Sequence, residues 1–383
     1  MDLIEEIIIF LVGLLIFLKI RPQIYSKFDL YFRQCQKNFD IINNCPSIKK
    51  GRYFPTFYLS LGLLQAVFGS KSKHTEQFVK FRKQYIIIPD YGEFGVDWAY
   101  SDDKQLERRP KQKKMICIFP GLVSSINEPY IINILAKCYK HGYEVCLLND
   151  RLYTNRDNGR GVSFPKNKPF QFVEDYKKIL EIIKEQYQGY TFYAIGHSFG
   201  ANTLARYLGL YANENIFSAA VCVSNPWDFY LGQRYLSKTI DQFLLNSRKK
   251  ILKLYKHIFK DQKPNYTNYD YDEILQAKTC RELDNKFTSK LLGYRTADEY
   301  YKNISSIHYI DKINIPVLFI QSKDDPILNE NTLPVDEVKN NKNLLMIVTN
   351  TGGHVGWFEG LIQPKRWYIK PTLEFIDYLE QFN

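Results

Sequence analysis

The sequence predicts an α/β fold: a mostly parallel central sheet with helices on both faces and a helical cap insertion. Between residues 115 and 224, short apolar runs typical of buried strands alternate with segments whose apolar residues repeat at helical spacing. The stretch from about 229 to 310 has no strand signal and interrupts this alternation, as an inserted cap would. The length of 383 residues favours one extended domain with a short N-terminal appendage over two full domains.

The N-terminal segment is strongly apolar over residues 7–18. This run is shorter than the roughly 20 residues that cross a bilayer, although charged side chains at its ends could reach the surface. Acidic residues precede the run and basic residues follow it, so the positive-inside rule puts the catalytic body on the cytoplasmic side. We therefore expect a single membrane anchor over residues 1–21, with a buried amphipathic helix as the alternative.

The formal net charge is +11, and much of it lies between residues 19 and 52. A basic cluster directly after an apolar segment favours an anionic membrane surface as partner. We expect no nucleic-acid partner, because aromatic residues are not interleaved with a basic stripe in a known binding pattern. The seven cysteines lack the spacing of a disulfide framework or a zinc site, so we expect no metal and no other cofactor.

Residues 22–80 are predicted to form a connecting region with helices, which include the apolar run 57–68. The main domain is expected over residues 81–383. Its first two strand-like runs, 85–88 and 95–98, are joined by a turn. Such a hairpin predicts the antiparallel edge that many mostly parallel sheets carry.

The parallel part of the sheet is predicted to begin at the apolar run 115–119. Further strands are expected at 143–148, 190–196 and 217–224. Helical patterns separate them, and these lie from near 127, at 172–186 and at 201–208. This alternation predicts right-handed βαβ units.

The predicted cap over about 229–310 contains a basic segment, 248–263, with apolar residues on one face. This pattern fits a cap helix with a solvated outer side, and contact with lipid is the alternative. The sheet is expected to resume at 316–321 and 344–348. A final helix over 371–382 has proline in its first turn.

The stretch 190–208 combines a strand, a sharp turn and a helix around a Gly-x-Ser-x-Gly motif with Ser198 at its centre. A serine at the apex of such a turn needs small neighbours, here Gly196 and Gly200, and the turn lifts its hydroxyl towards substrate. The start of the following helix offers the backbone N–H of Phe199 to a developing negative charge. Ser198 is therefore the candidate nucleophile.

Two downstream loops supply a candidate acid and base. Asp324 and Asp325 follow the strand 316–321, and His354 follows the strand 344–348 within a glycine-rich loop. Catalytic groups gather at the carboxyl ends of strands in such sheets. The chain order of serine, aspartate and histidine is that of an α/β-hydrolase triad. We choose Asp325 over Asp324 because the acid in this loop usually sits just before the proline.

Proton chemistry assigns the expected roles. A serine hydroxyl is too weakly acidic to attack an ester at neutral pH, so His354 must take its proton and return it to the leaving alcohol. Asp325 orients the imidazole and stabilises its cationic form. The oxyanion needs two N–H donors, for which Phe199 and Leu122 are the candidates. His197 cannot turn back to the nucleophile, and the remaining histidines lack glycine-rich loops, so these are expected to be structural or solvated.

On these residues the chain resembles the AB hydrolase 4 family, the membrane-anchored abhydrolase-domain lipases and esterases. The resemblance runs from about residue 50 to the C-terminus. The most specific matches are Asp324-Asp325-Pro326 and the glycine-rich block 352–360. The other matching stretches are Tyr53-Phe-Pro-Thr, Gly62-Leu-Leu-Gln65, Pro89-Asp90-Tyr-Gly92, Val96-Asp97-Trp98, Pro120-Gly121-Leu122, Glu128-Pro-Tyr130-Ile131, Gly196-His-Ser-Phe-Gly200 with Asn202, Ala219-Ala-Val, Ser224-Asn-Pro-Trp-Asp228, Arg281-Glu-Leu-Asp284, Phe287-Thr288 and Gly293-Tyr294.

The resemblance implies a lipase or esterase that hydrolyses lipid esters, phospholipids and monoacylglycerols among them, without metal and with an N-terminal membrane segment. Phe119 departs from it, because the family commonly has histidine before Pro-Gly, and the pattern at Asn149-Asp150-Arg151 is also altered. Three functions therefore stay open. The chain could be a membrane-associated serine hydrolase with an acyl-enzyme on Ser198, an inert hydrolase-shaped subunit of a membrane complex, or an acyltransferase that uses the same triad.

Overall fold

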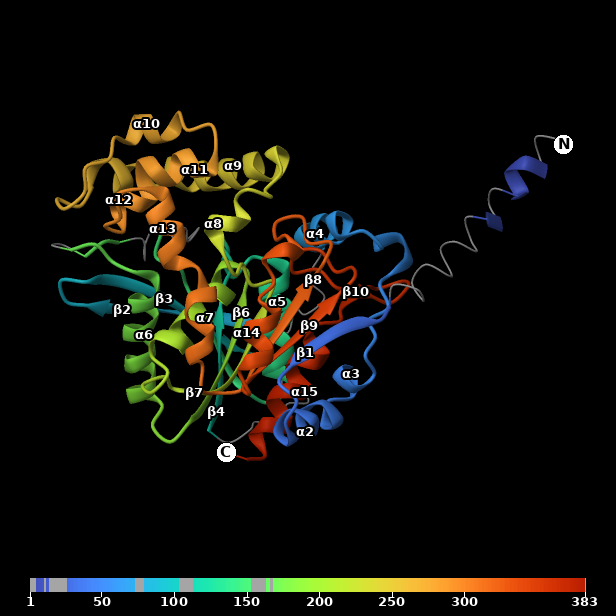
Figure 1. Cartoon of the computed structure of the whole chain (residues 1–383). Helices are drawn as coiled ribbons and strands as arrows, with labels where there is room; N and C mark the ends of the chain where they lie inside the picture. The colour runs from blue at the N-terminus through green and yellow to red at the C-terminus, as the bar shows by residue number, and fades with distance from the viewer. Residues whose placement is uncertain are drawn as a thin grey trace.

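The structure is a computed structural model that describes residues 5–9, 12–13, 26–72, 79–102, 113–152, 163–165 and 168–382. Its centre is a nine-stranded sheet with the strand order β1-β9-β8-β7-β6-β4-β5-β3-β2 (Figure 1). The strands of this sheet are β1 Phe28–Phe32, β2 Lys80–Ile88, β3 Gly92–Tyr100, β4 Lys114–Phe119, β5 Glu144–Leu148, β6 Thr191–His197, β7 Phe217–Val223, β8 Val317–Ser322 and β9 Leu344–Thr349. A separate pair is formed by β10 Phe358–Glu359 and β11 Lys365–Arg366.

The inner strands of the sheet, from β5 through β9, pair in parallel. Both edges are antiparallel, because β2 pairs with β3, β3 with β5, and β1 with β9. The predicted mostly parallel sheet and its hairpin edge are confirmed. Strand β1 was not expected within the region 22–80, and it pairs with the last strand of the sheet, Phe28 opposite Thr349. The division of the chain into domains stays a prediction.

The two faces of the sheet carry separate cores, because successive side chains of a strand point to opposite faces. In β4, Met115, Cys117 and Phe119 belong to one apolar cluster, which includes residues of α6, α7 and the cap. Ile116 and Ile118 belong to the other cluster, with residues of α2, α3, α5 and α15. These helices and the remaining ones outside the cap are α2 Gln36–Asn44, α3 Pro46–Lys49, η1 Phe57–Leu59, α4 Gly62–Lys71, α5 Pro129–Lys140, α6 Phe172–Gln186, α7 Phe199–Leu210, η7 Glu330–Thr332, α14 Val335–Asn340 and α15 Ile369–Glu380.

The cap is a group of mostly short helices, with one long helix, that lies at one end of the sheet (Figure 1). The predicted basic segment 248–263 spans the end of one long helix and a following π-helical turn, and its apolar residues Ile251, Tyr255 and Phe259 are buried in the cluster shared with the sheet. The apolar face is therefore covered by protein. The cap elements are α8 Phe229–Gly232, α9 Lys238–Leu254, η3 His257–Asp261, α10 Tyr271–Leu275, α11 Cys280–Leu283, η4 Asp284–Thr288, α12 Ser289–Leu291, α13 Ala297–Ile304, η5 Ser306–His308 and η6 Ile310–Lys312.

The predicted membrane localisation requires correction. Within the residues that the structure describes, no helix is both long enough and apolar enough to cross a bilayer. The helix described at residues 5–9 is too short to span one. Most of the predicted anchor at 1–21 lies outside the described residues. The assignment of the chain as a protein with a single membrane-spanning anchor and a cytoplasmic catalytic body is therefore withdrawn.

Candidate active site

Ser198 lies at the apex of the turn between β6 and α7. Its backbone has φ 52° and ψ −123°, a conformation that side-chain-bearing residues rarely adopt. Its N–H donates to the carbonyl oxygen of Val223 in the neighbouring strand, at 2.9 Å. A Cβ added to Gly196 would lie 2.6 Å from the Cα of Ala201, so the turn is too tight for a larger residue there. The small flanking residues thus permit the strained turn that presents the hydroxyl.

His354 and Asp325 reach Ser198 from the loops after β9 and β8. The His354 Nε2 atom is 2.8 Å from the Ser198 hydroxyl oxygen, and its Nδ1 atom is 2.8 Å from Asp325 Oδ2. The other carboxylate oxygen of Asp325 accepts the backbone N–H groups of Ile327 and Leu328, at 2.8 and 3.0 Å. The structure therefore brings the three predicted side chains into one hydrogen-bonded series and fixes the carboxylate at its far end.

Asp324, the alternative acid, makes different contacts. Its Oδ1 atom accepts the backbone N–H groups of Gly352 and Gly353, at 2.9 and 3.0 Å, and the hydroxyl of Ser322. These glycines directly precede His354 in the chain. Asp324 therefore holds the backbone of the histidine loop, whereas Asp325 contacts the imidazole itself.

Ser224 holds the same loop on the other side of His354. It follows β7 with a φ of 51°, is fully buried, and its hydroxyl oxygen accepts the backbone N–H of Val355 at 3.1 Å. Val355 and Trp357 also have positive φ values of 54°. A loop with this many unfavourable backbone conformations keeps its shape only where surrounding groups hold it.

The two predicted oxyanion donors lie beside Ser198. Leu122 and Phe199 both line the cavity that Ser198 faces. Their loops touch, because a Cβ added to Gly200 would lie 2.3 Å from the carbonyl oxygen of Pro120. The residue before Leu122 is also fixed, since the N–H of Gly121 donates to the hydroxyl of Tyr130 at 2.9 Å and this hydroxyl donates to Ser124 at 2.7 Å.

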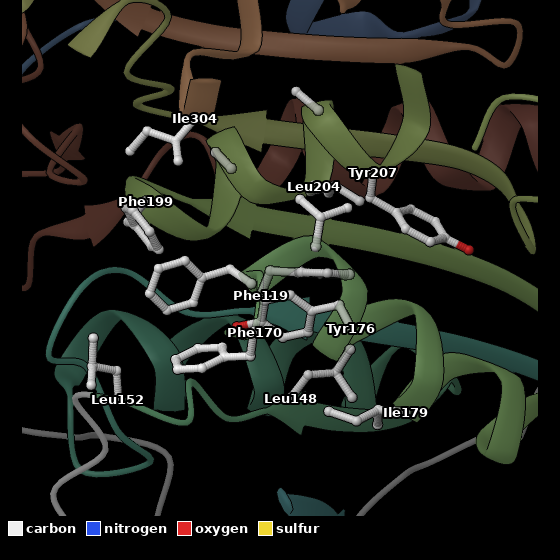
Figure 2. Packing of buried hydrophobic residues seen from close by; sticks show 14 of the residues in the cluster. Phe119, Leu148, Leu152, Phe170, Tyr176, Ile179, Phe199, Leu204, Tyr207 and Ile304 are labelled. Carbon is white, nitrogen blue, oxygen red and sulfur yellow. The ribbon is translucent and has the colours of Figure 1, made fainter. Parts of the chain in front are cut away.

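Phe119, the departure from the expected histidine, points into the core. Its ring is fully buried and lies 4.7 Å from the ring of Tyr176, centroid to centroid (Figure 2). It also packs edge-on against Phe217 at 6.1 Å. Phe119 therefore places an apolar ring, in place of the expected histidine ring, within an aromatic cluster.

A cavity of about 160 Å³ opens beside Ser198, between the ends of the sheet strands and the cap. Most of its wall is apolar or aromatic. The wall also includes a buried ion pair of Arg248 with Asp284, and Asp284 accepts a hydrogen bond from the hydroxyl of Tyr301 at 2.7 Å. Its other polar residues include Asp228, Gln233, Asn329 and Thr332. Other wall residues include Leu122, Phe199, Trp227, Phe229, Leu244, Ile304, Ile327 and Leu328.

Residues 114–361 match the family model described as the alpha/beta hydrolase fold, which is more than half of the chain. The chain belongs to the alpha/beta hydrolase family.

Three relatives illustrate the range of this family. The human protein named phospholipase ABHD3 is 27% identical over 358 residues, which cover 91% of this chain and 82% of the relative. The monoacylglycerol lipase of Saccharomyces cerevisiae is 29% identical over 290 residues, which cover 72% of this chain and 62% of the relative. The yeast medium-chain fatty acid ethyl ester synthase/esterase 2 is 26% identical over 416 residues, covering 90% of each chain. The resemblance to abhydrolase-domain lipases is confirmed, while the narrower AB hydrolase 4 label stays a prediction.

The sequence did not indicate the side chains that hold the loops of the candidate site. Ser224, Tyr130 and Gln65 stood within the matching stretches without an assigned role. The one local signal was Ser224, which follows β7 beside β6, at the carboxyl edge of the sheet where functional groups gather. Ser224 and Gln65 accept backbone N–H groups that are distant in the chain, and Tyr130 accepts the backbone N–H of Gly121, and such bonds leave no pattern in the sequence.

His197, next to Ser198, is fully buried with its Nε2 atom 3.2 Å from the hydroxyl of Tyr368. Burial, aided by the positive charge of Arg366, lowers the pKa of His197 to about 3. The unfolded chain therefore binds more protons than the folded hydrolase between about pH 6.5 and pH 3, so stability falls as the pH falls through this window.

We predict that His197→Phe removes this part of the pH dependence. Between pH 6 and pH 4, the free energy of unfolding of the wild type should fall by roughly 1 kcal/mol per pH unit more than that of the variant. Urea denaturation at several pH values measures both slopes. Equal slopes would show that His197 does not stay neutral in the folded protein.

Proposed function

We propose that the chain is a serine-dependent carboxylic ester hydrolase that cleaves acyl esters of lipids. The observation that carries the proposal is the hydrogen-bonded series from Asp325 through His354 to Ser198, with both distances at 2.8 Å, beside a mostly apolar cavity. The printed activities of the relatives, phospholipase, monoacylglycerol lipase and esterase, support ester hydrolysis as the reaction and lipids as the substrate class.

In the proposed reaction, neutral His354 accepts the Ser198 proton at Nε2 while the serine oxygen attacks the ester carbonyl. The resulting imidazolium donates its Nδ1 proton in a hydrogen bond to Asp325, whose negative charge stabilises it. Nε2 then protonates the leaving alcohol, which leaves an acyl-enzyme on Ser198. Water repeats the sequence, with His354 as its base, and releases the fatty acid.

The tetrahedral intermediates carry a negatively charged oxygen, for which the N–H groups of Phe199 and Leu122 are the proposed donors. A single donor of this kind contributes roughly 2.7–4 kcal/mol to the transition state. The Tyr130 hydroxyl supports this role, because it fixes Gly121, the residue before Leu122. Phe199 lies at the first position of α7, where the helix dipole also favours negative charge.

The mostly apolar wall supports the proposal that the cavity holds the aliphatic acyl chain of the substrate. Burying methylene groups against apolar side chains is favourable by about 0.8 kcal/mol for each group. The predicted inert-subunit alternative would need a collapsed pocket or a disconnected imidazole. The open cavity and the short hydrogen bonds of His354 argue against it.

The proposal is tested by incubating the purified protein with a monoacylglycerol and, separately, with a phospholipid, and measuring fatty-acid release. We expect release from at least one of them, and complete inhibition by a fluorophosphonate that forms one adduct, on Ser198. Folded protein that releases no fatty acid and forms no adduct would contradict the proposal.

Acyl transfer is the second candidate, and the yeast relative named as a synthase and esterase favours it. The same acyl-enzyme would then pass its acyl group to an alcohol. Product analysis with added ethanol separates the two reactions. Fatty acid alone supports hydrolysis, whereas accumulation of ethyl ester supports transfer.

A further inference from the structure

Helix α4 is docked onto the body by an unusual set of residues. Its fully buried positions are Gly62, Gln65 and Gly69, which share one face of the helix. Its apolar side chains Leu63, Leu64 and Val67 are 54%, 45% and 46% exposed, whereas Phe68 packs edge-on against Phe358. The position of α4 therefore depends on close backbone contact and on one polar side chain as well as on the packing of Phe68.

Both ends of this buried face contact the segment that carries His354. A Cβ added to Gly353 would lie 2.1 Å from the carbonyl oxygen of Gly62, so no residue with a side chain fits between the loop and the start of α4. At the other end, the carbonyl oxygen of Gly69 accepts a hydrogen bond from Arg366 at 2.9 Å. The helix thus contacts the chain on both sides of His354, at Gly353 before it and at Arg366 after it.

Gln65 connects the two ends of the histidine loop. Its Nε2 donates to the hydroxyl of Thr351 at 3.3 Å, and its Oε1 accepts the backbone N–H of Phe358 at 2.9 Å. The same oxygen accepts the hydroxyl of Tyr53 at 3.0 Å. A buried amide with all these partners in place holds a defined geometry, because any shift would leave a buried polar group without a hydrogen bond.

We propose that Gln65 is a positioning residue for His354, and that α4 completes the catalytic site from outside the region that matches the family model. This inference rests on the proposed function. The loop between Thr351 and Phe358 contains positive φ values at Gly353, Val355 and Trp357 and would relax without its anchors. Loss of Gln65 would let the imidazole leave the line between the hydroxyl and the carboxylate.

The test compares Gln65→Met with Gln84→Met in the full chain. Methionine keeps the length of the side chain and removes its hydrogen bonds. Gln84 accepts the indole N–H of Trp98 at 2.8 Å on the far edge of the sheet, so its variant controls for the loss of a glutamine hydrogen bond as such. We expect Gln65→Met to lower kcat about 10- to 100-fold, as a misplacement of catalytic groups by about 1 Å does. KM should stay within about twofold, because Gln65 does not line the cavity.

Two further measurements separate positioning from general destabilisation. The rate of fluorophosphonate labelling of Ser198 should fall in parallel with kcat in Gln65→Met, and amide hydrogen exchange should rise in residues 351–358. In an Asp325→Asn background, Gln65→Met should cause little further loss, because both changes act through the same imidazole. Gln65→Asn, which keeps the amide but shortens its reach, should show the same pattern more weakly and serves if the methionine variant does not fold.

The outcomes distinguish this inference from the proposed function. If the wild type hydrolyses lipid esters and both Gln65 variants match its kcat, the positioning role is wrong and the proposed function stands. A raised KM at unchanged kcat, or full additivity with Asp325→Asn, would equally overturn it. If the wild type neither hydrolyses ester nor is labelled, the proposed function fails. Separately, hydrogen exchange in residues 351–358 that is unchanged in Gln65→Met would overturn the structural role of Gln65.

Discussion

Replacing Ser198 by alanine is expected to lower kcat about 10⁶-fold, the loss found when the nucleophile of such a triad is removed. The oxyanion donors and the binding cavity remain, so a residual acceleration of about 10³ to 10⁴ over the uncatalysed reaction should persist. Alanine occupies the φ of 52° at this position with the same difficulty as serine, so the variant should fold. Steady-state hydrolysis of the substrate identified for the wild type, together with fluorophosphonate labelling, measures the effect.

Ser247→Ala is the matched control. Ser247 lies on α9, where its hydroxyl donates to the carbonyl oxygen of Phe243 at 3.0 Å, and it does not line the cavity. Its variant should retain wild-type activity and labelling. Covalent labelling and hydrolysis that survive in Ser198→Ala would mean that another residue is the nucleophile.

The sequence predicts the sheet well where local patterns carry the information. Strands β4 to β9 follow from apolar runs buried on both faces, and Asp325 and His354 follow from their positions after two of those strands. Strand β1 escaped prediction because five residues in a basic region carry little periodic signal, and its partner Thr349 is distant in the chain. The pairing with β9 that makes residues 28–32 a strand cannot be predicted from those five residues alone.

The supports of the site were harder to predict for a related reason. Gln65 and Ser224 act on backbone N–H groups of one loop, which any residue type can offer. Neither the donor residue nor the sequence spacing reveals such a bond. The division of labour between Asp324 and Asp325 likewise becomes visible only in three dimensions, since the two side chains are adjacent in sequence and contact different parts of the histidine loop.

Replacing each of these two adjacent aspartates by asparagine should have different consequences for activity. In Asp325→Asn, the amide oxygen can keep the N–H groups of Ile327 and Leu328, so the amide nitrogen turns towards His354. An amide N–H facing Nδ1 forces the proton to Nε2, and the imidazole then cannot accept the proton of Ser198. We expect kcat to fall about 10⁴-fold, as in other triads with the wrong histidine tautomer.

In Asp324→Asn, the amide oxygen can still accept the N–H groups of Gly352 and Gly353, because the bonds that hold the loop need an acceptor and no charge. Activity should therefore remain close to that of the wild type. Asp324→Ala removes the acceptor of the Gly352 and Gly353 N–H groups and of the Ser322 hydroxyl, at a cost of roughly 1–3 kcal/mol for each donor left unsatisfied, so it should lower both the melting temperature and kcat. Parallel measurement of kcat and thermal unfolding in the three variants decides the assignment. If Asp324→Asn were the inactive variant and Asp325→Asn the active one, the acid of the triad would be Asp324, and the contacts described above would not be those of the working enzyme.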